Sequence, residues 1–79
     1  MAVVRLFARA REIAGRGRDE VDGDTVAEVV AAAAARYGSA FVELLPTCRI
    51  WLNGDEVDPS TPVGAGDEVA VLPPVSGGA

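Results

Sequence analysis

Residues 23–38, GDTVAEVVAAAAARYG, hold the clearest helical pattern in this 79-residue chain. Thr25 is followed three residues later by Glu28, a capping-box pattern in which two side chains satisfy free amide groups at a helix start. Gly38 follows as a suitable helix end. Between these signals, apolar side chains recur at the spacing of one helix face, and they are Val26, Val29, Val30, Ala33 and Tyr37. We therefore expect one main helix whose apolar face packs on a core.

Strand patterns lie on both sides of this helix, and the most apolar ones stand near the two ends of the chain. AVVRLF (residues 2–7) and EVAVL (68–72) are rich in β-branched residues and predict strands. A short helical turn ended by Gly15 follows the first strand. Residues 18–21 then predict a second strand that pairs with the first in a hairpin with a long connection.

The segment between the main helix and the last strand predicts a short helix and a tight hairpin. SAFVELLP (39–46) is a candidate helix ended by Pro46. RIWL (49–52) predicts a strand, and Asn53-Gly54 supplies the positive φ angles of a two-residue turn. A return strand begins at Glu56, and residues 58–67 are rich in turn residues.

The order of these elements predicts the fold. The expected order is two strands, a helix and three strands. If the first and last strands pair, they pair in parallel, because a crossover through the helix joins the two halves. The class is α+β, with a mixed sheet of about five strands packed on one main helix. This is the β-grasp architecture of ubiquitin. We expect a single domain over residues 1–74, followed by a flexible C-terminal tail, residues 75–79.

Composition excludes several kinds of function. The net charge is −5, from 12 acidic and 7 basic residues, which argues against nucleic acid or an anionic membrane as a partner. A basic protein partner is compatible with this charge, although acidic surfaces more often serve solubility. The chain has no histidine, the commonest general base and metal ligand. With Cys48 as the only cysteine, no internal disulfide or cysteine-rich metal site can form. We expect Cys48 to be buried as a small apolar residue and not to be a reactive thiol.

No segment has the features of a targeting or membrane sequence. Arginines interrupt the apolar residues of the first 15 positions, unlike the core of a signal peptide. The alanine-rich helix is shorter than the ~20 apolar residues that span a bilayer. We therefore expect a cytoplasmic protein.

The chain ends in LPPVSGGA (72–79), which is a poor end for a packed domain. Pro73 and Pro74 remove two amide donors and favour a stiff, extended exit from the last strand. The five residues after them reach roughly 17 Å when fully extended. Gly77 and Gly78 have no side chains, so this backbone can pass through a narrow slot. A frayed terminus is the ordinary alternative. A P-loop is excluded because no helix follows the glycines.

Several segments together resemble the small subunit of molybdopterin synthase, the MoaD-type sulfur carriers of the MoaD/ThiS family. They are VRLFARAREIAG, TVAEVV, LNGDEV and the ending GDEVAVLPPVSGG, and the total length agrees. The resemblance implies a non-catalytic carrier, with Gly78 at the place of the family's terminal glycine. Its carboxylate would be adenylated by an ATP-using, ubiquitin-activating-like enzyme, and a sulfur donor protein would convert it to a thiocarboxylate. The large synthase subunit would then use that sulfur to build the dithiolene of molybdopterin. The carrier itself would bind no cofactor.

The resemblance also implies roles for the residues around the tail. Val75, Ser76 and Gly77 would lie in the partner's channel. A small domain cannot bury all its apolar residues, so we expect a partner interface near the tail, formed by Phe7, Trp51, Leu72, Pro73 and Pro74.

Ala79 departs from the family pattern, because it places the carboxylate about one residue, roughly 3.5 Å, too far along. Three interpretations of Ala79 are open: a peptidase removes it, the partner tolerates it, or the terminus has been altered artificially. Removal is our preferred interpretation.

Two alternative functions remain open from the sequence. One is a sulfur carrier for thiamine, cysteine or a secondary metabolite, and the other is a ubiquitin-like protein modifier.

Overall fold

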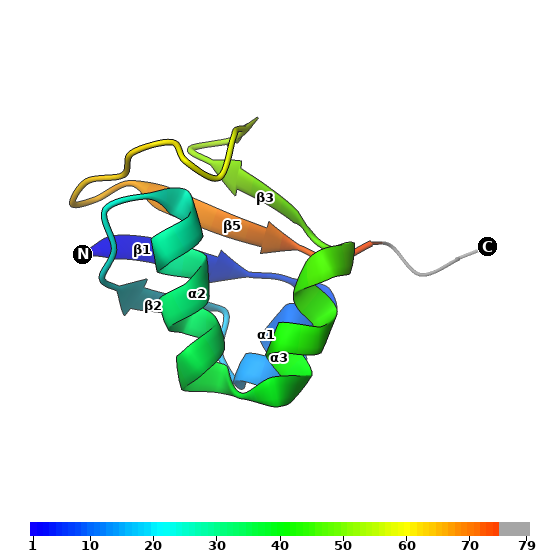
Figure 1. The fold of residues 1–79 in the computed structure, drawn as a ribbon. Coiled ribbons are helices and arrows are strands. Elements are labelled where there is room, and N and C mark those ends of the chain that lie inside the picture. The colour runs from blue at the N-terminus through cyan, green and yellow to red at the C-terminus, as the bar shows by residue number, and fades with distance from the viewer. Residues whose placement is uncertain (75–79) are drawn as a thin grey trace.

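The computed structural model describes residues 1–74 and shows one mixed sheet with helices on one of its faces (Figure 1). The elements in chain order are β1 (Ala2–Leu6), α1 (Ala8–Ala14), β2 (Arg18–Val21), α2 (Val26–Tyr37), α3 (Ser39–Leu44), a 3₁₀ turn (Leu45–Thr47), β3 (Arg49–Leu52), β4 (Asp55–Glu56) and β5 (Glu68–Leu72). The predicted tail, residues 75–79, lies outside the described residues. The α+β class and the β-grasp architecture are confirmed.

The sheet has the strand order β2-β1-β5-β3-β4, with β1 and β5 parallel and the other pairs antiparallel. In the register of the two central strands, Val4 lies beside Val69 and Leu6 beside Val71. Because β1 and β5 run in the same direction, the end of β5 lies at the opposite end of the sheet from the N-terminus (Figure 1). The chain therefore leaves the sheet from its middle, not from an edge.

Helix α2 begins where the sequence predicts, with one difference in its capping bonds. The Thr25 hydroxyl accepts a hydrogen bond from the Glu28 amide at 3.2 Å. The Glu28 carboxylate accepts one from the Asp24 amide at 3.0 Å, one residue earlier than a capping box requires. Two further amides at the helix start donate to backbone carbonyls of the loop 58–67. These two hydrogen bonds therefore fix the loop against the helix start.

No helix within residues 1–74 has the length and apolar character needed to cross a membrane.

The predicted turns follow from positive φ angles. Asn53 has φ 50° and Gly54 has φ 90°, which gives the two-residue connection between β3 and β4. Gly15, with φ 77°, ends α1 as expected. The α-helix α3 stops before Pro46, and the proline lies inside the 3₁₀ turn that follows.

The core fills the space between the sheet and the helices. The predicted stripe on α2 is confirmed: Val26, Val29 and Ala33 are buried, and Val30 and Tyr37 are half-buried against them. Phe41 of α3 is fully buried and meets the Tyr37 ring edge-on, with 5.1 Å between ring centroids. From the sheet come Ala2, Val4, Leu6, Val21, Val69 and Val71. The helix layer therefore packs on the two central strands, β1 and β5, and β5 is the strand that precedes the tail in the sequence.

A polar cluster joins strand β2 to the end of α2. Asp19 accepts hydrogen bonds from Tyr37 Oη at 2.7 Å and Arg36 Nη1 at 2.8 Å. Burial acts to raise the pKa of Asp19, but these bonds outweigh it and lower the pKa from 3.8 to about 2. Burial and the bond to Asp19 raise the pKa of Tyr37 to about 12. The cluster therefore favours an ionised Asp19 in the folded chain.

Replacing Asp19 with Asn is expected to lower the free energy of unfolding at neutral pH by roughly 1–2 kcal/mol, because it weakens charged hydrogen bonds. A lowered pKa stabilises the fold above the unfolded-state value and loses that contribution as pH falls through the folded-state value. The difference between wild type and Asp19→Asn should therefore shrink as the pH falls from 3.8 to about 2. Denaturant unfolding across this range measures it. Glu20→Gln, in the exposed pair with Arg18 at 3.9 Å, is the control and should show little change.

Candidate partner-binding surface at the end of β5

The face of the sheet opposite the helices is the candidate functional surface. Side chains alternate along β5, so that Val69 and Val71 are buried while Ala70 and Leu72 point to the other face. By the same alternation, Val3 and Arg5 of β1 lie on that outer face. The outer face therefore presents the second set of side chains from the two central strands.

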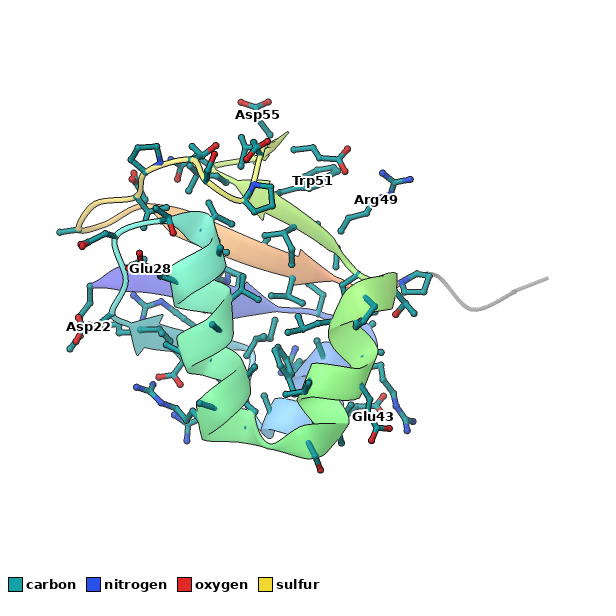
Figure 2. The ribbon with its side chains drawn as sticks, viewed as in Figure 1. Asp22, Glu28, Glu43, Arg49, Trp51 and Asp55 are labelled. Carbon is teal, nitrogen blue, oxygen red and sulfur yellow. The ribbon has the colours of Figure 1, made fainter. Side chains whose placement is uncertain are left out.

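Strand register brings the predicted interface residues together. Trp51 lies beside Ala70, and Arg49 lies beside Leu72. A hollow of about 400 Å³ at the end of β5 is lined by Thr47, Arg49, Trp51, Leu72, Pro73 and Pro74. Figure 2 shows Trp51 and Arg49 on the β3 side of the sheet, with Arg49 nearer the end where β5 finishes.

A second hollow adjoins β1 at the same end of the sheet. Phe7 directly follows Leu6, which pairs with Val71, so it comes next to Leu72 on the outer face. The guanidinium of Arg5 lies 5.9 Å from the centre of the Phe7 ring, within the range of a cation–π contact. Arg5, Leu6, Phe7, Arg11, Gly17 and Arg18 line this hollow of about 420 Å³.

The predicted interface residues differ in exposure. Phe7 is 40% exposed and Trp51 is 37% exposed, which is high for large apolar side chains. Leu72 and Pro73 are half-buried, and Pro74 is exposed. The five residues expected to reach into a partner, Val75, Ser76, Gly77, Gly78 and Ala79, lie outside the described residues. The structure thus shows the root of the tail and not the tail itself.

Cys48 lies next to this surface but is not suited to react there. It is half-buried, and its Sγ lies 3.4 Å from the Leu44 carbonyl oxygen. Burial raises the pKa of the thiol, which keeps it protonated. Cys48 was expected to be buried; it is instead half-buried, although it packs against the core as a small apolar residue does. Across the described 74 residues, no three His, Cys, Asp or Glu side chains are grouped to hold a metal ion.

The arginines at this end of the sheet are functional candidates that the sequence pattern alone does not reveal. Arg5, Arg11, Arg18 and Arg49 line the two hollows that adjoin the apolar residues. The period-two alternation of a strand gives part of this signal, since it places Arg49 on the same face as Trp51. Their convergence with Arg11 of α1 depends on the sheet order and could not be read from one strand.

Comparisons with known proteins agree with this architecture. The sequence model of the ThiS family matches residues 4–78. The molybdopterin synthase sulfur carrier subunit of Chlamydomonas reinhardtii is 36% identical over an alignment 84 residues long, which covers 95% of this chain and 95% of that one. Among solved structures, SAMP1 from Haloferax volcanii is 34% identical with a TM-score of 0.76, covering 98% of each chain.

A further solved structure contains a complex. It holds subunits 1 and 2 of the molybdopterin-converting factor of Helicobacter pylori, and the matched chain is 28% identical with a TM-score of 0.71. The match covers 98% of the present chain and 97% of that one. Family match, sequence identity and shared fold all extend over nearly the whole length. The chain therefore belongs to the ThiS family.

Proposed function

We propose that this chain is the small, sulfur-carrying subunit of a molybdopterin synthase, and that its tail carries the reacting group. The observation that carries the proposal is the similarity, over nearly the whole chain, to the Chlamydomonas subunit of that name. The ending Gly77-Gly78 supports it. The half-buried thiol of Cys48, with its raised pKa, offers no competing nucleophile near the tail.

The proposed chemistry takes place at the Gly78 carboxylate inside partner proteins. A carboxylate is a poor electrophile, so it first attacks the α-phosphate of ATP on a ubiquitin-activating-like enzyme. Pyrophosphate leaves, and the acyl adenylate that forms has AMP as a good leaving group. Sulfide delivered by a sulfur donor protein then attacks the carbonyl carbon, the bond to AMP breaks, and the product is a thiocarboxylate. In this scheme ATP binds to the activating enzyme, and the carrier holds no cofactor.

The shape of the carrier suits this chemistry. Pro73 and Pro74 continue from a central strand and favour an extended exit. Val75, Ser76 and Gly77 then occupy the partner's channel and bring Gly78 to the reacting centre. The folded body stays on the partner's surface, where Phe7, Trp51 and Leu72 make contact together with the two prolines. The large synthase subunit and the activating enzyme would use this same face in turn.

The pathway is tested by binding and product formation. We expect the chain to co-elute with the large molybdopterin synthase subunit of its own organism, and the thiocarboxylated chain to support molybdopterin formation there. Co-elution only with an enzyme of thiamine, cysteine or secondary-metabolite synthesis would assign the chain to that other pathway.

The large synthase subunit and the activating enzyme should also exclude each other from the carrier. Recovery of both on one carrier molecule would contradict a shared face.

Trp51→Asp is expected to weaken binding of the large subunit by about 30-fold or more, because exposed tryptophans at interface centres are frequent hot spots. The variant should remain folded, since Trp51 lies outside the buried core. Val42→Asp is a matched control: Val42 of α3 is 51% exposed but lies on the helix layer. Calorimetric titration of wild type and both variants measures the effect. Equal loss in the two variants would show that the outer face is not the binding surface.

A protein modifier is the second candidate, because SAMP1, the small archaeal modifier protein 1 of Haloferax volcanii, is similar over nearly the whole chain. In that role the tail glycine would form isopeptide bonds to lysines of target proteins. All seven basic residues of the present chain are arginines. It therefore offers no lysine side chain for linkage to further copies. Lysine-linked adducts on other proteins in the native cell, found by mass spectrometry, would favour this function.

A further inference from the structure

Positive charge is gathered at one end of this acidic molecule. Arg5 lies beside Arg18 in the register of β1 and β2, and Arg49 lies beside Leu72, the last residue of β5. Together with Arg11, these residues form what we call the arginine rim, and they line both hollows at the root of the tail. Among the described residues that line these two hollows, none is acidic. The lining of the two hollows is thus basic in a chain whose net charge is −5. The nearest carboxylates are those of Glu20, Glu56 and Glu68, each paired with one rim arginine.

Acidic residues gather toward the other end of the strands. Asp22 directly follows β2, Asp67 directly precedes β5, and both positions lie at the end where β1 begins. Figure 2 shows Asp22 and Arg49 at opposite ends of the sheet. Glu43 is an acidic residue at the rim's end, but it belongs to α3 on the helix layer. On the outer face itself, Glu20 and Glu68 both lie beside Val3, nearer the acidic end than Arg5 and Arg18. The outer face is therefore polarised along the strand direction, with its positive end where β5 finishes.

Three guanidinium groups of the rim are held only by exposed ion pairs, so they are available to a partner. Arg5 is paired with Glu68 at 3.6 Å, and its side chain is 41% exposed. Arg18 is paired with Glu20 at 3.9 Å, and its side chain is 59% exposed. Arg49 is paired with Glu56 at 3.2 Å, and its side chain is 70% exposed. Exposed pairs of this kind contribute little to stability and are screened by salt. Carboxylates of a docking protein can replace these partners without the fold having to change.

Distance decides which anionic group the rim meets. Four residues separate Pro74 from the Gly78 carboxylate, a span of at most roughly 14 Å when the chain is extended. A tail threaded through a narrow channel must be close to extended, so ATP phosphates at its tip lie far from the rim. The arginines instead meet the protein surface around the channel mouth. Their flat, forked groups suit carboxylates.

We propose that the arginine rim docks on a ring of carboxylates at the mouth of the channel in the large synthase subunit, and that this contact orients the tail for entry. Phe7, Trp51 and Leu72 would fill an apolar seat inside that ring. This inference rests on the proposed function, because it takes the partner to be the protein that receives the tail. The charge contact would steer the encounter and would therefore be strongest at low ionic strength.

Binding of the large subunit by single charge-removing variants tests the proposal. Arg18→Gln and Arg49→Gln should each lower the affinity by about three- to ten-fold at low salt, and by less at high salt. Arg9→Gln is the matched control. It removes the same charge, but Arg9 of α1 lies beside Glu43 and Leu44 on the helix layer, away from the rim. Equal affinities and salt dependence for wild type and both rim variants would overturn the proposal while leaving the proposed function intact.

Two measurements on the isolated chain separate the other outcomes. Titration with poly-L-glutamate, followed by amide chemical shifts, should perturb the ends of β1, β2 and β3 near the rim and spare the acidic end. Absence of this pattern would contradict the rim as a carboxylate-binding surface. If the pattern is seen and wild type does not bind the large subunit, the proposed function fails while the surface chemistry stands.

Sedimentation at low salt tests whether the rim instead binds a second copy of this chain. Self-association abolished by Arg49→Gln would overturn the proposal in favour of head-to-tail contacts.

Discussion

The Gly77→Val chain is expected to fold like the wild type and to lose adenylation of its carboxyl end by about a hundred-fold or more, since even small misplacement of reacting atoms has effects of that size. Position 77 follows the folded body, so the core residues keep their packing. A β-branched side chain widens the tail and restricts its backbone. Both changes oppose passage through a channel sized for glycine.

The measurement is ATP–pyrophosphate exchange with the activating enzyme, accompanied by thermal unfolding of the variant. Gly64→Val is a matched control in the loop before β5. A Cβ at Gly64 would have only Asp67 Oδ2 nearby, at 3.9 Å, so the same substitution fits there. The control should support normal exchange. Normal exchange by Gly77→Val as well would remove the argument for a narrow channel.

The chain that ends at Gly78 is expected to give at least about ten times more thiocarboxylate than the chain that ends at Ala79, because reacting atoms need near-contact distances of ~3–3.5 Å. An added residue moves the carboxylate by about 3.5 Å. Its methyl group also enters a space suited to glycine. Bending of the Gly-Gly pair could return the new carboxylate to its place, but ordering such a bend costs entropy.

The two forms should be prepared separately and compared with the same activating enzyme and sulfur donor. Thermal unfolding provides the control, and both forms should unfold alike because they share residues 1–74. Equal thiocarboxylate yields would make Ala79 the functional terminus and would end the case for processing. A higher yield from the Gly78 form would instead imply that a peptidase acts before activation.

Local signals in the sequence were sufficient for most elements of the fold. Thr25 and Gly38 bound the main helix where the structure has it, and Asn53-Gly54 turns between β3 and β4. The parallel direction of the first and last strands follows from the helix crossover once the two strands are neighbours, and the structure shows that they are. These features depend on neighbours in sequence or on a short set of allowed connections.

Features that depend on distant contacts were not predicted. An added Cβ at Gly23 would lie 2.7 Å from the Val29 backbone nitrogen, so this glycine permits the close approach of the loop to α2. Nothing in the sequence around Asp19 indicates that it accepts a hydrogen bond from Tyr37, which lies 18 positions later. The convergence of Arg18 and Arg49 likewise needed the strand order. Each of these contacts joins segments whose distance is set only by the complete fold.

The candidate site was predictable in part. Phe7, Trp51 and Leu72 were expected near the tail because small domains leave apolar residues exposed, and the structure places all three at the end of β5. Their roles in binding remain proposals. The predicted functions of Val75 to Ala79 rest on the sequence and on the family resemblance, because these residues lie outside the described part of the chain.

Intact mass spectrometry of the protein from its native cell tests the central claim, that the chain carries sulfur on its terminal glycine. We expect a species that lacks the alanine residue and has gained the mass difference between one sulfur and one oxygen atom. Fragmentation should place the sulfur on the Gly78 carboxyl group. Two results together would contradict this claim. The first is that the cell makes molybdopterin while this chain keeps an unmodified carboxylate. The second is that no sulfur-bearing form of the chain accumulates in the same cell after the large subunit has been removed.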